Sequence, residues 1–150
     1  MTKSDDQFPA ASETRENFRY FTSITTRWRD NDVYQHVNNT VYISWMDTAV
    51  AEYLIKEGGM RYGESKTIGL IVESFCQYRA PVAYPEVVEA GIRVAHIGGS
   101  SARYEVGIFK EGVAEAASVG YFVHVFVDSD TNRPAGVPPA YREALERIKV

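Results

Sequence analysis

The chain has 150 residues, of which 45% are hydrophobic, and a formal net charge of −4 at pH 7. This length suits one domain with a substantial core and is short for two, and the acidic balance argues against a nucleic-acid partner because no basic surface could replace phosphate counterions. The single cysteine, Cys76, excludes an internal disulfide and is expected in the reducing cytoplasm, and no apolar run is long enough to span a membrane.

Residues 1–17 are polar and mixed in charge, and they lack the apolar segment of a secretory signal. We expect a mobile N-terminal arm here, followed by a single domain over residues 18–150. From Phe18 to Trp28 apolar and aromatic residues alternate with more polar ones, which predicts the first β-strand.

A short polar loop over residues 29–39 directly precedes a long apolar segment. From Thr40 to Lys56 apolar residues cover nearly the whole circumference of a helix, which predicts a helix buried on most of its surface. Asn38 or Asn39 is a suitable N-cap, and Gly58-Gly59 predict the end of the helix. The one polar stripe consists of Ser44, Thr48, Glu52 and Lys56.

The rest of the chain predicts strands and one short helix. Alternating apolar residues recur in four segments, and turns rich in glycine or proline separate them. One long helix after the first strand, with hairpin-linked strands after it, predicts an α+β fold in which an antiparallel sheet of about five strands wraps around the helix. The strand segments are 68–78, 88–96, 102–108 and 113–127, and the C-terminal helix opens at Pro138 or Pro139.

The loop from Arg29 to Tyr42 resembles the signature loop of the 4-hydroxybenzoyl-CoA thioesterase family, whose pattern is roughly D-x-D-x-x-G-H-V-N-N-x-x-Y. Gln35 stands where the family usually has Gly. The resemblance extends over most of residues 18–147, and it implies the hot-dog fold and hydrolysis of an acyl-CoA or similar acyl thioester without a metal or redox cofactor. Further matching segments are Trp45–Ala49, Arg79–Val82, Gly99–Ser101 and Asp128–Pro134.

The resemblance implies that Asp32 is the nucleophile or general base, and a carboxylate can serve as either without a neighbouring base. The oxyanion site would be the backbone N–H groups near Asn39 and Thr40, since a helix N-terminus favours negative charge. His36 could orient Asp32 or a water, or it could form a structural hydrogen bond to the loop backbone. Asp47 is a rival acid, because some hot-dog thioesterases take their acid from this helix.

Gln35 departs from the family pattern in a way that affects the loop. A glycine there permits a positive φ that Gln tolerates poorly, so we expect the loop to run differently or Gln35 to help orient substrate. The turn at Gly99 has no charged residue for CoA phosphates, so either pantetheine lies along its backbone or an acyl carrier protein delivers the acyl group. The implied substrate-binding residues are Gln35, Asn38, Thr40, Tyr42, Gly99, Ser100 and Ser101.

Other polar residues carry weaker signals. Asp30 is expected to be a turn residue or a partner of the site, and the loop acids and His36 lack the further ligands of a metal site. Cys76 lies among apolar strand residues, which favours a buried thiol over a nucleophile. His96 and His124 are expected to satisfy local backbone groups.

Two alternative functions share this fold. One is a non-catalytic module that binds an acyl thioester. The other is a hot-dog hydratase, for which Asp32 and His36 stand closer together in sequence than is usual.

We also expect self-association. A sheet around one helix leaves long edges, which are normally paired or covered, and residues 113–127 are apolar on both faces. The resemblance implies a homodimer or homotetramer in which subunits join edge to edge. Each site would then lie between two subunits, with the Asp32 loop of one chain facing strands of the other.

Overall fold

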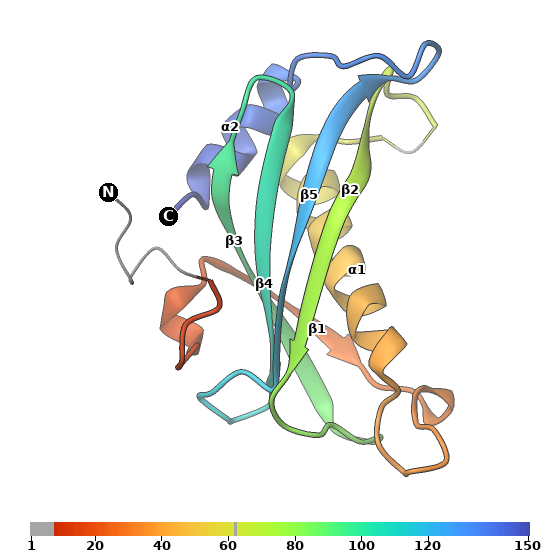
Figure 1. Cartoon of the computed structure of the whole chain (residues 1–150), viewed down its shortest axis with the longest axis vertical. Helices are drawn as coiled ribbons and strands as arrows, with labels where there is room; N and C mark the ends of the chain where they lie inside the picture. The colour runs from red at the N-terminus through yellow and green to blue at the C-terminus, as the bar shows by residue number, and fades with distance from the viewer. Residues whose placement is uncertain (1–7, 62) are drawn as a thin grey trace.

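The computed structural model describes residues 8–61 and 63–150. Five antiparallel strands form one sheet in the order β1-β3-β4-β5-β2, and the long helix α1 lies along one face of it (Figure 1). This confirms the predicted α+β arrangement. The elements are β1 (Tyr20–Thr25), α1 (Asn39–Gly58), β2 (Thr67–Tyr78), β3 (Val87–Ile97), β4 (Ser101–Lys110), β5 (Ser118–Asp128) and α2 (Pro139–Arg147).

Helix α1 begins where Asn38 caps it, because the Asn38 side chain accepts a hydrogen bond from the backbone N–H of Thr40. It ends at Gly59, whose φ of 71° gives the left-handed turn that commonly closes helices. Gly120 on β5 lets the helix approach the sheet, since a Cβ there would lie 2.7 Å from the Met46 sulfur. The buried face of α1 consists mainly of Tyr42, Trp45, Met46, Ala49, Val50, Tyr53 and Leu54.

The face of the sheet opposite α1 is packed against the chain's own N-terminal segment, residues 8–18. Thr14 forms an antiparallel bridge with Glu115, and a short 3-10 helix, η2 (Arg15–Asn17), leads toward β1. The expectation of a mobile arm over residues 1–17 is therefore wrong for residues 8–17, and residues 1–7 lie outside the described residues. The second apolar cluster on this face consists of Phe18, Phe109, Ala116 and Val119, with Phe8 and Phe21 packed against it.

A buried ion cluster fixes this segment to the sheet. Arg93 on β3 donates two hydrogen bonds of 3.1 Å to the Glu13 carboxylate and one of 2.7 Å to Glu105 on β4. The guanidinium carbon of Arg93 also lies 4.5 Å from the ring centre of Phe18. Because a carboxylate as buried as that of Glu13 needs a partner, these bonds explain why the segment is held in place.

Two strands are shorter than predicted. The first covers only Tyr20–Thr25, and Trp28 belongs to a 3-10 helix, η3 (Trp28–Asp30). The last begins at Ser118 rather than residue 113. Residues 114–116 instead pair with the N-terminal segment, where the backbone N–H of Ala116 donates to the Glu13 carbonyl at 2.9 Å.

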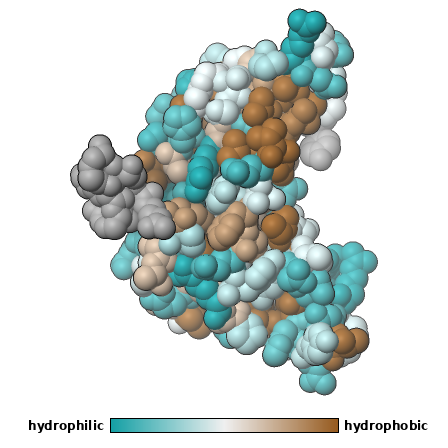
Figure 2. Space-filling view, viewed as in Figure 1, coloured by the Kyte–Doolittle hydropathy of each residue, from teal (hydrophilic) through white to brown (hydrophobic). Residues whose placement is uncertain are grey.

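Strand β2 forms one edge of the sheet and pairs only with β5. Its first half exposes large apolar side chains, and its register shifts at Val72, between Ile71 and Glu73. Figure 2 shows hydrophobic side chains gathered near the upper ends of β2 and β5. A free edge with apolar side chains is the kind of surface that proteins normally pair or cover. The exposed apolar residues of this strand include Ile68, Leu70, Ile71 and Val72.

Candidate functional site

Asp30 anchors the polar loop that precedes α1. Its buried carboxylate accepts hydrogen bonds from the backbone N–H of Arg27 at 2.7 Å and from the Arg27 guanidinium at 2.8 Å. The Asp30 carbonyl accepts a bond of 2.8 Å from the backbone N–H of Asn38. Asp30 is therefore a structural residue that fixes both ends of the loop, which agrees with the first of its two predicted roles, a turn residue.

Asp32 lies at the start of a hydrogen-bonded chain that ends on α1. One carboxylate oxygen accepts from the backbone N–H of Tyr34 at 2.9 Å, and the other accepts from the Asn38 side-chain amide at 3.1 Å. The Asn38 oxygen accepts in turn from the backbone N–H and the hydroxyl of Thr40, at 3.0 and 2.7 Å. Asn38 thus caps the helix and orients Asp32 at the same time.

Gln35 adopts the left-handed conformation that a glycine would take, with φ of 67°. The backbone closes around it, because Gln35 N–H donates to the Asp32 carbonyl and Asp32 N–H donates to the His36 carbonyl, both at 2.9 Å. Gln35 therefore takes the conformation that the family's Gly would allow, and its departure from the pattern does not remove the positive φ from this turn. The loop keeps its turn at a backbone cost of about 1 kcal/mol, and the Gln35 side chain is exposed.

A cavity of about 320 Å³ opens beside the start of α1. The hydroxyl of Tyr78 donates to the Asn39 carbonyl at 3.0 Å and so joins β2 to the helix start. The pKa of Tyr78 is raised to about 12 by burial and by its interaction with Cys76, so the phenol keeps its proton. The lining residues are His36, Val37, Asn39, Tyr42, Tyr78, Arg79, Ala80 and Pro81.

The first turn of α1 leaves one backbone donor available. The N–H of Thr40 is taken by the Asn38 side chain, and the N–H of Val41 donates to the Asn38 carbonyl at 3.0 Å. Across residues 8–61 and 63–150, the N–H of Asn39 has no acceptor. Of the two backbone N–H groups predicted to hold the oxyanion, those of Asn39 and Thr40, only that of Asn39 is therefore free.

The His36 side chain makes no hydrogen bond to the described part of the chain, so its predicted bond to the loop backbone is absent.

The predicted substrate contacts at Gly99, Ser100 and Ser101 lie far from Asp32 within one chain. The Asp32 loop adjoins the start of β3, where the Asn31 side chain accepts a bond of 3.0 Å from the backbone N–H of Tyr84. The turn at residues 98–101 follows the end of β3, an 11-residue strand that spans about 35 Å. One chain therefore does not bring the two predicted groups together.

A basic side chain that sequence reasoning missed reaches this turn. Arg142 on α2 donates a hydrogen bond of 2.7 Å to the Gly98 carbonyl, and the backbone N–H of Val137 donates one of 3.0 Å to the Gly99 carbonyl. Arg142 and Gly98 are 44 residues apart, so no local sequence signal could indicate the contact.

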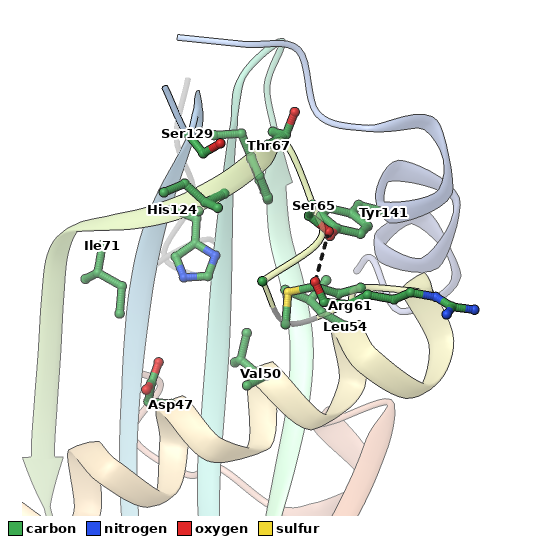
Figure 3. A pocket seen from close by; sticks show the side chains of 16 residues that line it. Asp47, Val50, Leu54, Arg61, Ser65, Thr67, Ile71, His124, Ser129 and Tyr141 are labelled. Atoms are coloured by element: carbon green, nitrogen blue, oxygen red, sulfur yellow. Dashed lines mark hydrogen bonds between the residues drawn. The ribbon is translucent and has the colours of Figure 1, made fainter. Parts of the chain in front are cut away.

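Asp47, the rival acid, lines a different and larger pocket of about 500 Å³ between α1 and the ends of β2 and β5 (Figure 3). Asp47 is exposed and lies eight residues after Asn39 on α1, which is about 12 Å along the helix axis. Within one chain, Asp47 therefore lines the larger pocket, whereas the loop that carries Asp32 contributes His36 and Val37 to the smaller cavity. The apolar walls of the larger pocket include Val50, Leu54, Met60, Ile68, Ile71 and Phe126.

His124 on β5 also lines this larger pocket, and its partner is a side chain rather than the expected backbone group. The His124 Nδ1 lies 3.1 Å from the hydroxyl of Tyr104. Burial lowers the pKa of His124 to about 4, so the ring is neutral at pH 7. Of the other predicted residues, His96 is exposed, and Cys76 is half-buried with its sulfur 3.3 Å from the Ser118 hydroxyl.

The described residues, 8–61 and 63–150, contain no group of three or more His, Cys, Asp or Glu side chains placed to hold a metal ion. In the same ranges, no helix is both long and apolar enough to cross a bilayer.

A family profile and a curated protein that match this chain are both thioesterases or thioesterase-like. The profile of the thioesterase-like superfamily matches residues 26–145. The long-chain acyl-CoA thioesterase FadM of Escherichia coli K12 is 23% identical over 128 residues, which cover 85% of this chain and 97% of FadM.

Two solved structures extend the likeness. The PA5185 protein of Pseudomonas aeruginosa strain PAO1 is 47% identical with a TM-score of 0.91, over 92% of this chain and 96% of that chain. A thioesterase from Thermus thermophilus, solved with coenzyme A and Zn, is 29% identical with a TM-score of 0.72, over 85% of this chain and 98% of that chain.

Proposed function

Because this chain belongs to the thioesterase-like superfamily, we propose that it hydrolyses acyl-CoA thioesters to a free acid and CoA, with Asp32 as the reacting carboxylate. The observation that carries this proposal is the Asp32–Asn38–Thr40 chain, which holds a carboxylate beside the free N–H of Asn39. The acyl-CoA substrate is supported by the similarity to FadM and to a thioesterase solved with coenzyme A.

In this mechanism Asp32 attacks the thioester carbonyl carbon or deprotonates a water that attacks it. A new C–O bond forms, and the carbonyl oxygen becomes an oxyanion that accepts from the N–H of Asn39. A donor aimed in this way lowers such a barrier by about 3 kcal/mol. The C–S bond then breaks, and the CoA thiolate leaves and takes a proton, from the protonated Asp32 in the general-base route or from solvent water in the nucleophilic route. Water releases the acid if Asp32 was the nucleophile.

The neighbouring residues would position the substrate. His36, Asn39 and Tyr42 line the cavity beside the reacting carbonyl, and Asn38 orients Asp32. The free thiol of Cys76 fits the reducing cytoplasm as the compartment.

We place each site between two chains. The free apolar edge of β2 supports antiparallel pairing with β2 of a second copy. Such pairing reverses direction, so the Tyr78 end of one β2 would lie beside the Thr67 end of the other. The Asp32 loop adjoins the Tyr78 end through the Tyr78–Asn39 bond, and the larger pocket adjoins the Thr67 end. The pairing would therefore bring the Asp32 loop of one chain toward the larger pocket and the Gly99–Ser101 turn of its partner.

The test measures thiol release from a panel of straight-chain and aromatic acyl-CoAs. Asp32→Asn keeps the shape of the side chain but can neither attack nor accept a proton, so we expect kcat/KM to fall at least about 10²-fold. The matched control, Asp47→Asn, should retain activity within about tenfold. Loss of activity only in Asp47→Asn would show that the reacting carboxylate is Asp47 on α1. Tight acyl-CoA binding without turnover by the wild type would instead favour the non-catalytic module.

Light scattering on the same preparation tests the shared site. We expect a mass of at least twice the 16.9 kDa of one chain. A fully active monomer would contradict the pairing through β2.

A further inference from the structure

The larger pocket has a buried polar side chain in its wall, that of His124. Near its upper end, the hydroxyls of Ser65 and Tyr141 lie 3.1 Å apart, Ser129 is exposed, and Thr67 is half-buried. His124, by contrast, is 9% exposed, and its ring projects from β5 into the space between β2 and α1 (Figure 3). Each of its two ring nitrogens can take part in one hydrogen bond, and a nitrogen that faces the pocket can bond to a ligand there.

One ring nitrogen has its partner, and that partner fixes the tautomer. Tyr104 is 1% exposed, and its hydroxyl contacts no other hydrogen-bonding group in the described residues than Nδ1 of His124, at 3.1 Å. Burial raises the pKa of Tyr104, so its O–H proton is present and must be donated. Nδ1 is therefore the acceptor, and the proton of the neutral ring sits on Nε2.

The second ring nitrogen has no such partner. Within residues 8–61 and 63–150, nothing accepts a hydrogen bond from Nε2 of His124. Gly69 on β2 leaves space for the His124 ring, since a Cβ at this position would lie only 2.9 Å from Nδ1 of His124. The pocket thus presents one preset N–H donor inside a space of about 500 Å³.

We infer that this pocket binds the acyl group of the substrate and that His124 Nε2–H donates to an oxygen carried by that group, a hydroxyl or a ketone. The inference rests on the proposed function and adds the substrate class to it. A carboxylate is disfavoured because the Asp47 side chain lies in the same pocket, and the Arg61 side chain extends away from it (Figure 3). The charged CoA moiety does not suit walls that are mainly apolar.

The role of His124 is one of specificity. A site that hydrogen-bonds a substrate oxygen disfavours the analogue that lacks it, because the buried donor is then left unpaired. An apolar acyl chain of the same length would fill the pocket but would leave the Nε2–H of His124 without a hydrogen-bond acceptor. His124 is therefore expected to act on the choice of substrate, whereas Asp32 acts on the chemical step.

The experiment compares dodecanoyl-CoA with a series of hydroxydodecanoyl-CoAs that carry the hydroxyl at different carbons. We expect the wild type to prefer at least one hydroxylated chain by about tenfold or more in kcat/KM. In His124→Phe this ratio should fall to about one, because the donor that distinguishes the two chains is gone. Tyr104→Phe removes the hydroxyl that keeps the ring proton of His124 on Nε2, and it should lower the ratio partly. His96→Phe, an exposed His on β3, is the matched control and should leave it unchanged.

The outcomes separate the two proposals. Equal rates on plain and hydroxylated chains in the wild type, unchanged in His124→Phe, would overturn the inference while the hydrolase assignment stands. If no thioester is cleaved, the hydrolase assignment fails, and binding of non-hydrolysable thioether analogues of the same pairs decides the inference. Tighter binding of the hydroxylated analogue, reduced in Tyr104→Phe and lost in His124→Phe, would then support it, and equal binding would overturn it.

Discussion

Two groups of polar residues in this molecule differ in how they are bonded. On the face opposite α1, Glu13, Arg93 and Glu105 are all buried, and each charge has an opposite charge beside it. At the start of α1, the loop with Asp32 and Asn38 is half-buried, and its groups keep free positions for further hydrogen bonds. The first group holds the fold together, and the second is available for chemistry.

The pKa of Glu13 reflects this difference. Burial alone would raise it, but the hydrogen bonds from Arg93 and from the backbone N–H of Ala10 bring the pKa below its usual value. The Glu13 carboxylate is therefore more stable with its partners than a free one in water. Removing one residue of the Glu13–Arg93–Glu105 cluster leaves another charge buried and short of partners. Removing a residue of the Asp32 loop instead exposes its partner to water.

The largest effect is expected from Glu13→Ala, which should lower the free energy of unfolding by about 3–5 kcal/mol because Arg93 loses its bidentate partner. The matched control is Asp32→Ala, which should change that free energy by less than about 1 kcal/mol. Urea unfolding at neutral pH measures both. Equal losses in the two variants would show that burial does not distinguish the two groups.

A smaller effect is expected from His124, which is buried but has only one partner. The unfolded chain binds a proton at this ring below its ordinary pKa of 6.5, while the folded chain does not until about pH 4. Folding stability should therefore fall as the pH is lowered through this range, by about 2 kcal/mol between pH 7 and pH 5. The slope should flatten in His124→Phe when urea unfolding is followed at both pH values. An unchanged slope would assign the effect to another group.

The smallest effect is expected from the loop itself. Gln35→Gly removes the strain of a positive φ and should stabilise the protein by up to about 1 kcal/mol, less what the freer unfolded chain costs. A thermal scan with the melting temperature as readout measures it. A clear loss of stability would mean that the Gln35 side chain makes a contact worth more than the strain.

Sequence reasoning predicted the elements whose signal is local. The alternation of the strands, the apolar circumference of α1 and the Asn38 cap are all set by neighbours within a few residues. It missed what depends on distant partners. Arg93 is a polar residue in an alternating strand and so resembles a solvent-facing one, and its partner Glu13 is 80 residues earlier in a segment without periodicity.

The candidate site divides in the same way. The loop motif names both Asp32 and Asn38, and the structure adds that their side chains are hydrogen-bonded, a local contact between positions six apart. The bond between His124 and Tyr104, 20 residues apart on neighbouring strands, depends on the β4–β5 register, which periodicity alone does not give. The separation of Asp32 from the Gly99–Ser101 turn could not be predicted either, since a resemblance to a family names residues but not the chain that supplies them.

The packing of residues 8–18 against the sheet has a consequence for the order of events during synthesis. This segment leaves the ribosome before the sheet does, since Ser12 bonds Glu115, which lies 103 residues later. At roughly 5–20 residues per second, about 5–20 s pass before that partner has been made. During this interval Glu13 is hydrated, and Arg93 emerges before the covering segment can close over it. Residues 8–18, although translated before the sheet, are thus among the last parts of the domain to dock.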